Sequence, residues 1–118
     1  MRPVEPTELV AGVWQLRPWP AASADLDEVL AERYAPDDLP RERAARLEGW
    51  SRGDLLSFAV REATTGASVA EVLVLVSPDG HASIAVRTRL DHLGARIDPD
   101  VEDVVRRWAT TGLGLTVD

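Results

Sequence analysis

The fold is decided by residues 55–89, LLSFAVREATTGASVAEVLVLVSPDGHASIAVRTR. Two turn-forming groups, Thr-Thr-Gly at residues 64–66 and Pro-Asp-Gly at residues 78–80, divide this stretch into three segments rich in apolar and β-branched residues. Such segments are typical of strands, and the middle one is apolar enough to be buried on both faces. The stretch therefore predicts an antiparallel meander with strands over residues 55–61, 69–76 and 82–89.

The N-terminal half adds a strand and two helices. We expect a strand over residues 12–17, because Trp14 and Leu16 fall on one face and prolines follow. Apolar residues at helical spacing predict one helix from about residue 23 to residue 35 and a second from about residue 40 to residue 52. The apolar stripe of the second helix is expected to consist of Leu47 and Trp50, beside Ala44.

The C-terminal part predicts a loop, a helix and a short strand. Asp98 and Pro99 mark the start of the helix, because Asp is a favoured N-cap and proline suits the first helical position. The helix is expected to end at Gly112 and a strand to follow over residues 113–117. Its apolar face repeats at i, i+3, i+4 and i+7, at Val101, Val104, Val105 and Trp108.

These elements predict an α+β, layered fold with a central, mostly antiparallel sheet and helices on both faces. Residues 1–10 contain two prolines and no periodicity, so we expect an extended arm there. Residues 11–118 are expected to form a single domain, since 118 residues lie within the usual size of one.

Composition excludes several classes of site. The chain contains no cysteine, which excludes disulfides, thiolate metal sites and a cysteine nucleophile. All 13 basic residues are arginine, so a Schiff-base lysine is excluded as well. The net charge of −7 argues against nucleic-acid binding, and no apolar run is long enough for a membrane span or a signal peptide. We therefore expect a cytoplasmic protein without a metal site.

The order of elements, with three stretches of sequence, resembles the GNAT superfamily of acyl-CoA-dependent N-acyltransferases. The stretches are LRPW at residues 16–19, WSRGDLLSFAVR at residues 50–61 with VAEV at residues 69–72, and RWA at residues 107–109 with LGL at residues 113–115. The resemblance covers about residues 13–117. It implies a GNAT-like sheet that is C-terminally truncated, because family members continue with another helix and two strands after the position of Asp118.

The resemblance also locates the family's cofactor loop, and this loop is degenerate. Members of the family hold the pyrophosphate of coenzyme A on a glycine-rich loop before the third helix, and the matching residues here are Gly94, Ala95 and Arg96. Gly94 keeps the first glycine, whereas Arg96 places a side chain where the backbone would approach phosphate. Acidic residues fill the following helix start: Asp98, Asp100, Glu102 and Asp103. We therefore expect no cofactor, and acetyl-CoA only if the chain is an active transferase.

Two residues are candidates for proton transfer. Glu71 lies in the middle of an apolar strand, where a carboxylate could serve as a general base or could pair with an arginine such as Arg61. His92 lies in the loop that would face the cofactor, where it could act as a base, contact a ligand, or be an ordinary solvated residue.

Three other side chains are candidates for a ligand or interface contact. Trp19 lies between two prolines and is expected to be partly exposed or to anchor its loop. Arg87 and Arg89 could offset part of the acidic charge near the cofactor loop. The arginines of the second helix, Arg41, Arg43 and Arg46, are expected to be solvated.

Two functions remain open. In the first, the chain is a GNAT-like protein repurposed away from acetyl transfer, as a binding module for a small molecule or a protein, or as a small enzyme of another class. In the second, it is an acetyl-CoA-dependent N-acetyltransferase, either by itself or completed by a second chain. The last strand, over residues 113–117, would leave an open sheet edge, so we expect a homodimer through that edge or another protein partner.

Overall fold

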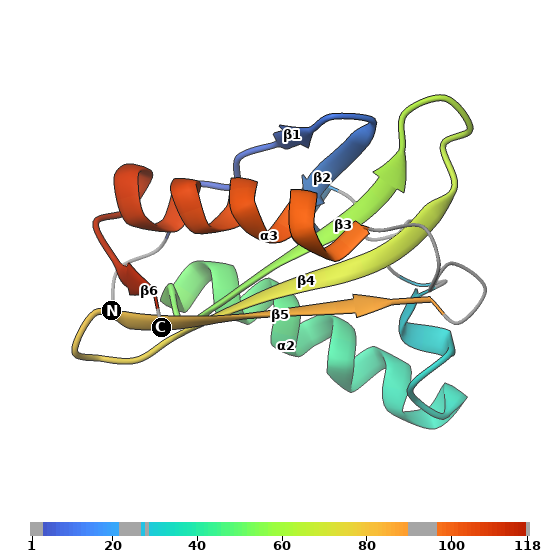
Figure 1. Ribbon diagram of the computed structural model, residues 1–118. Coiled ribbons are helices and arrows are strands. Elements are labelled where there is room, and N and C mark those ends of the chain that lie inside the picture. The colour runs from blue at the N-terminus through green and yellow to red at the C-terminus, as the bar shows by residue number, and fades with distance from the viewer. Residues whose placement is uncertain (1–3, 22–26, 28, 90–96, 118) are drawn as a thin grey trace.

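The computed structural model describes residues 4–21, 27, 29–89 and 97–117 and contains a six-stranded sheet with the spatial order β1-β2-β3-β4-β5-β6 (Figure 1). Adjacent strands are antiparallel, except that β5 and β6 run parallel. Helix α2 covers one face and helix α3 the other, which confirms the expected layered α+β class (Figure 1). The strands are β1 (Leu9–Ala11), β2 (Trp14–Pro18), β3 (Leu55–Glu62), β4 (Ser68–Val76), β5 (His81–Thr88) and β6 (Thr116–Val117). The helices are η1 (Trp19–Ala21), η2 (Pro36–Asp38), α2 (Leu39–Arg52), α3 (Ile97–Arg107) and the single π-helical turn η4 (Trp108–Gly112).

The meander of β3, β4 and β5 confirms the central prediction. Strand β4 is buried from Ser68 to Val74, which is possible because β3 and β5 pair with its two edges while helices cover its two faces. The turn between β4 and β5 ends at Gly80, whose φ of 85° is a left-handed conformation that glycine adopts without strain. The two predicted turns therefore join β3, β4 and β5 as successive hairpins of the sheet.

The N-terminal edge of the sheet is a hairpin of which the sequence predicted only one strand. Strand β2 lies where it was expected, with Trp14 and Leu16 buried. Strand β1 pairs with it, Leu9 opposite Leu16, across a turn in which Gly12 has a φ of 61°. Part of the expected extended arm thus belongs to the sheet, because its backbone supplies the hydrogen-bonding partners of β2.

Helix α2 lies at its predicted position but buries a different face. Gly53 ends the helix in the left-handed region, with φ at 77°. The buried residues are Arg46, Gly49 and Trp50, whereas Leu47 is 45% exposed, so the predicted stripe is wrong at Leu47. Part of the helix expected before α2 lies outside the described residues; residues 29–31 are helical.

Helix α3 presents its predicted apolar face to the sheet. Val101 and Val105 are completely buried, and α3 packs against β5 and β1. Its last turn widens into η4, where Trp108 lies in a cluster with Trp50 of α2 and Phe58 of β3, at ring-centroid distances of 5.3 to 6.2 Å. The expected last strand is shorter than predicted, because only Thr116 and Val117 pair with β5.

Candidate functional site

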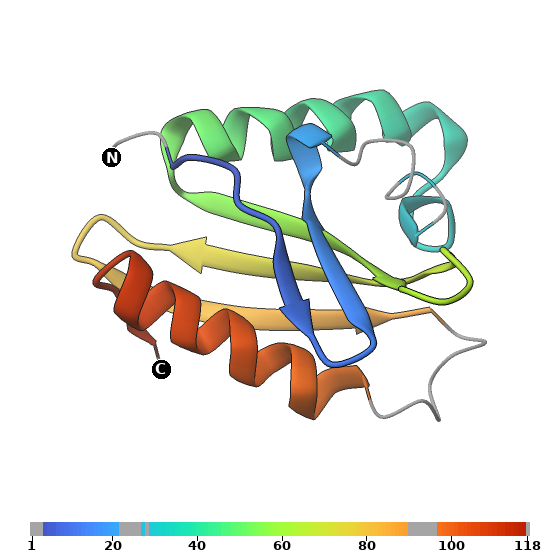
Figure 2. The ribbon, with the colours of Figure 1, turned by 90° about the horizontal axis from the view of Figure 1, so that it is seen from above.

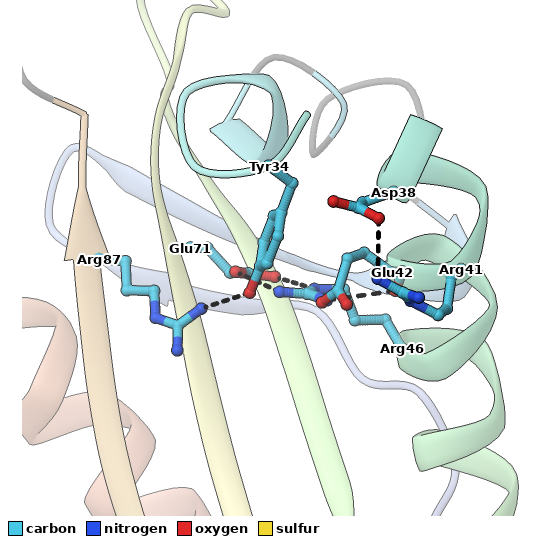
Figure 3. A network of polar contacts seen from close by, with 7 residues as sticks. All are labelled: Tyr34, Asp38, Arg41, Glu42, Arg46, Glu71 and Arg87. Carbon is cyan, nitrogen blue, oxygen red and sulfur yellow. Dashed lines mark hydrogen bonds and ion pairs between the residues drawn. The ribbon is translucent and has the colours of Figure 1, made fainter. Parts of the chain in front are cut away.

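The candidate site is a group of charged residues between the sheet and α2, with Glu71 at its centre. Glu71 lies in the middle of β4 on the face that α2 covers, and its side chain is completely buried. Both of its carboxylate oxygens accept hydrogen bonds from Arg46 of α2 (Figure 3). Nε of Arg46 lies 2.5 Å from Oε2, and Nη2 lies 3.0 Å from Oε1. This two-point contact is the strongest arrangement that a carboxylate and a guanidinium can form.

Arg46 is also held by other groups from its own side of the sheet. Its Nη1 donates to Oε1 of Glu42, one helical turn earlier, at 2.9 Å, and its guanidinium lies 5.6 Å from the ring centre of Tyr34. Burial alone would lower the pKa of Arg46, but hydrogen bonds and charge from Glu71 and a hydrogen bond from Glu42 raise it above its ordinary value. Arg46 is therefore a permanent cation shared by two carboxylates.

The geometry bears directly on the chemistry that Glu71 could perform. A general base needs an oxygen that can take a proton from a substrate within hydrogen-bond reach. Both oxygens of Glu71 already accept charged hydrogen bonds, and the side chain has no exposed surface. The arrangement is instead that of a buried ion pair that ties α2 to β4.

The expectation that Glu71 could pair with an arginine is confirmed, but the partner is Arg46 and not Arg61, and Arg46 itself was expected to be solvated. Arg61 does not pair with Glu71: it donates to Oε1 of Gln15 on β2 at 2.8 Å. A β-bulge after Val60 places Arg61 opposite Ser68, away from Glu71. Arg46 was expected on a solvated face but is only 3% exposed. The sequence held a signal for this, since Arg46 lies four residues before the buried Trp50 and so shares its helix face.

Arg87 and Arg89 extend the polar group along β5. Arg87 lies opposite Glu71 in the sheet register and donates to the hydroxyl of Tyr34 at 3.2 Å (Figure 3). Arg89 pairs with Glu32 at 2.9 Å and donates to the carbonyl oxygen of Ser68. Within the part of the chain that the structure describes, Arg87 forms no ion pair of its own. The structure thus places Arg87 next to Glu71, whereas Arg89 lies two residues further along the chain, beside Glu32 and Ser68.

The sequence left open whether Trp19 is partly exposed or anchors its loop. Trp19 follows β2 in η1 and is completely buried, so it anchors its loop rather than being partly exposed. Among the residues that the structure describes, none provides a hydrogen-bond partner for its indole Nε1. Trp19 therefore offers no surface to a ligand in this conformation.

The predicted cofactor loop lies outside the described residues. His92, Gly94, Ala95 and Arg96 fall there, as does the side chain of Asp98, so the expectations for them stay untested. Helix α3 begins at Ile97, one residue before the expected cap. Of the acids near its start, Asp100 and Asp103 are exposed, and Glu102 pairs with Arg106 at 2.9 Å.

Comparison with solved structures supports the fold. A protein from Vibrio cholerae assigned as a ribosomal-protein-serine acetyltransferase superposes with a TM-score of 0.75 and 17% identity, over 99% of this chain and 74% of that one. A protein from Bordetella pertussis assigned to the GNAT acetyltransferases gives a TM-score of 0.71 and 15% identity, over 94% and 76% of the two chains. A GCN5-related N-acetyltransferase from Brucella melitensis gives a TM-score of 0.62 and 18% identity, over 95% of this chain and 58% of that one.

These similarities establish a GNAT-like fold. No protein-family model matches the sequence, and no curated protein sequence matches it. Because each identity is below 20%, the comparison carries the fold and not the activity. Among the described residues, no helix is long and apolar enough to cross a membrane.

Proposed function

We propose that this chain is a GNAT-fold binding module, repurposed away from acetyl transfer, that does not use Glu71 as a base. The observation that carries the proposal is the two-point contact between Glu71 and Arg46, which occupies both oxygens of the one carboxylate buried in the central strand. A base in that position would have to break a buried ion pair before it could accept a proton, and breaking such a pair costs several kcal/mol.

The charge at the start of α3 supports the same proposal. A helix start binds phosphate through free N–H groups and the positive end of the helix dipole. Here Asp98, Asp100, Glu102 and Asp103 lie within the first two turns of α3, and Pro99 contributes no N–H. These carboxylates lower the potential that would attract the pyrophosphate of coenzyme A.

The second candidate is an acetyl-CoA-dependent N-acetyltransferase, either by itself or completed by a second chain. The observation that favours it is the similarity in fold to acetyltransferases from three bacteria. In that case a group other than the paired Glu71 would have to act as the base, or substrate binding would have to release Glu71 from Arg46.

A titration with acetyl-CoA separates the two functions. A ligand that binds only the folded state at 100 times its Kd adds about 2.7 kcal/mol to the free energy of unfolding. We expect no increase at millimolar acetyl-CoA, and no release of free coenzyme A when a panel of amines and N-terminal peptides is added. Stabilisation by acetyl-CoA, together with release of coenzyme A thiol, would establish the second candidate instead.

The role of Glu71 is tested on the same samples with Glu71→Gln and, as a matched control, Glu42→Gln, which changes the other carboxylate on Arg46. Circular dichroism must first show that both variants are folded. If thiol release is present and is lost only in Glu71→Gln, then Glu71 is the base and the proposal fails.

A further inference from the structure

A cavity of about 530 Å³ lies at the end of the sheet where β4 turns into β5. Its volume falls within the range of 300–1,000 Å³ that is usual for small-molecule sites. The N-terminal segment, the turn between β4 and β5, and the segment between η4 and β6 meet around it. Its principal wall residues are Val4, Glu5, Leu56, Val76, Leu113 and Leu115.

The cavity wall is mainly apolar, and the polar groups that line it are largely engaged. The hydroxyl of Ser77 lies within hydrogen-bond distance of a carboxylate oxygen of Asp79 and of the carbonyl oxygen of His81, and its single hydrogen is directed to one of these two acceptors. The N–H of Val76 donates to the carbonyl oxygen of Asp54, at 2.9 Å. An apolar ligand would therefore displace water from this wall without leaving many polar groups unpaired.

Glu5 is the one charged residue among those that line the cavity. Its side chain is exposed and forms no hydrogen bond or ion pair with any residue that the structure describes. The whole chain carries a net charge of −7, which adds to the negative potential at this rim. A ligand with a positive charge is favoured here, and a carboxylate or phosphate ligand is disfavoured.

We propose that this cavity binds a small apolar molecule carrying one ammonium group, with the apolar part between Val4, Leu113 and Leu115 and the ammonium beside Glu5. The site is separate from the Glu71 group. Glu71 lies opposite Arg87 near the end of β5, whereas the cavity adjoins Gly80 just before the start of β5, about 20 Å away along the strand. The inference holds whether or not the chain transfers acyl groups.

Three probes of equal chain length test the charge preference: octylamine, 1-octanol and octanoate. Each is titrated into the whole chain and followed by amide chemical shifts. We expect octylamine to bind most tightly and octanoate most weakly, with the largest shifts at Gly80, Leu113 and Leu115. A second hollow touches Glu5 on its other side, beside Leu47 and Ser51, and shifts confined to those two residues would overturn the proposal.

Two variants test the assigned contacts. Glu5→Gln should weaken the binding of octylamine by about two- to fivefold, the range for an exposed ion pair, and leave the affinity for 1-octanol unchanged. Glu8→Gln is the matched control, because Glu8 is an exposed acid in the same segment but does not line the cavity. This variant should change the affinity for neither octylamine nor 1-octanol. Val4→Trp should fill the cavity and weaken the binding of both ligands, while the circular dichroism spectrum of the protein stays unchanged. Equal octylamine affinity in Glu5→Gln and the parent chain would overturn the proposal, as would tighter binding of octanoate than of octylamine.

Discussion

Arg46 and Glu71 form a bidentate ion pair that is buried between α2 and β4. Removing two charges from water is costly, and the pair recovers that cost only because its geometry is bidentate and Glu42 satisfies a further N–H of Arg46. Without Arg46, the carboxylate of Glu71 would lie between apolar neighbours in β4 and the sheet-facing side of α2. The pair therefore acts as a fixed connection between α2 and the centre of the sheet.

The first prediction concerns the loss of one partner. Arg46→Met should lower the free energy of unfolding by about 3–5 kcal/mol, because it leaves the carboxylate of Glu71 buried without a counter-ion. The double variant Arg46→Met/Glu71→Leu should recover most of that loss, since no charge then remains buried. Urea denaturation of the two variants measures both effects.

A control on the same helix makes this prediction specific. Arg43 pairs with Asp27 at 2.6 Å, but its side chain is 38% exposed. Arg43→Met should therefore cost less than about 1 kcal/mol. If Arg46→Met cost no more than Arg43→Met, the buried pair would not be the connection described above.

A second prediction at this scale concerns the turn before β5. A hydrogen bond from the hydroxyl of Ser77, then one from the N–H of His81, holds the pKa of Asp79 below its ordinary value of 3.8. Because the folded pKa is the lower one, this interaction stabilises the fold above about pH 3.8, and the contribution is lost as the pH falls through the folded value.

Carboxyl ¹³C titration measures this shift. The pKa of Asp79 should lie below 3.8 in the parent chain and move towards 3.8 in Ser77→Ala. Ser83→Ala, which removes an exposed hydroxyl of β5 that does not touch Asp79, should leave it unchanged. An identical pKa in the parent chain and Ser77→Ala would show that the hydroxyl is not the cause.

Among the elements, α2 approaches β3 closely at one point. A Cβ atom added at Gly49 would lie 2.3 Å from the carbonyl oxygen of Leu55 and 2.7 Å from its Cβ atom. In an open helix, Gly→Ala stabilises by up to about 1 kcal/mol. Here the contact reverses the sign, because backbone atoms of β3 would have to move.

Gly49→Ala should therefore destabilise the chain, by about 1–3 kcal/mol as expected for overpacking. Ser51→Ala, at an exposed position two residues later in the same helix, should be neutral or slightly stabilising. Thermal unfolding of the two variants provides the comparison. A Gly49→Ala protein at least as stable as the parent would mean that α2 can shift away from β3 without loss.

Local signals predicted the elements better than they predicted the contacts between them. Turn residues and β-branched segments located β3, β4 and β5 within one or two residues, because both signals act over a few neighbours. The apolar stripe predicted for α2 is confirmed at Trp50 but wrong at Leu47. Arg46 is buried instead of solvated because it pairs with Glu71, 25 positions further along the chain. Such a partner has no signature in the local pattern.

The candidate site shows the same limit. The sequence selected Glu71, since a carboxylate inside an apolar strand is unusual, and it also selected Arg87. It did not select Tyr34, in the bend before η2, or Glu42 of α2. Both side chains join the group only because their segments fold over the sheet, along which α2 runs in Figure 2; Figure 3 shows the two side chains beside Arg87 and Arg46. Residue spacing relates side chains on a single element, whereas this site combines side chains from α2, β4, β5 and the bend before η2.

In the whole molecule, the sheet ends in the three-residue strand β1 at one edge and in the two-residue strand β6 at the other. Strand β6 joins β5 through only two residue pairs, and its other edge has no strand partner among residues 4–21, 27, 29–89 and 97–117. The N–H of Thr116 donates inward to the carbonyl oxygen of Gly80. Because backbone direction alternates along a strand, the N–H of Val117 points outward. Residues 113–117 contain no charge and no proline, which are the usual protections of an edge.

This edge predicts that the 118-residue chain forms a twofold dimer, in which β6 of one protomer pairs with β6 of its partner. Light scattering at micromolar concentration should give about twice the chain mass of 12.9 kDa. Val117→Pro should yield a folded monomer, because it removes only the outward-facing N–H. Thr116→Pro, one residue earlier, removes the N–H that bonds to Gly80 and should instead lower the melting temperature. A parent chain that stays monomeric at high concentration, or a Val117→Pro variant that stays dimeric, would show that β6 is not the interface.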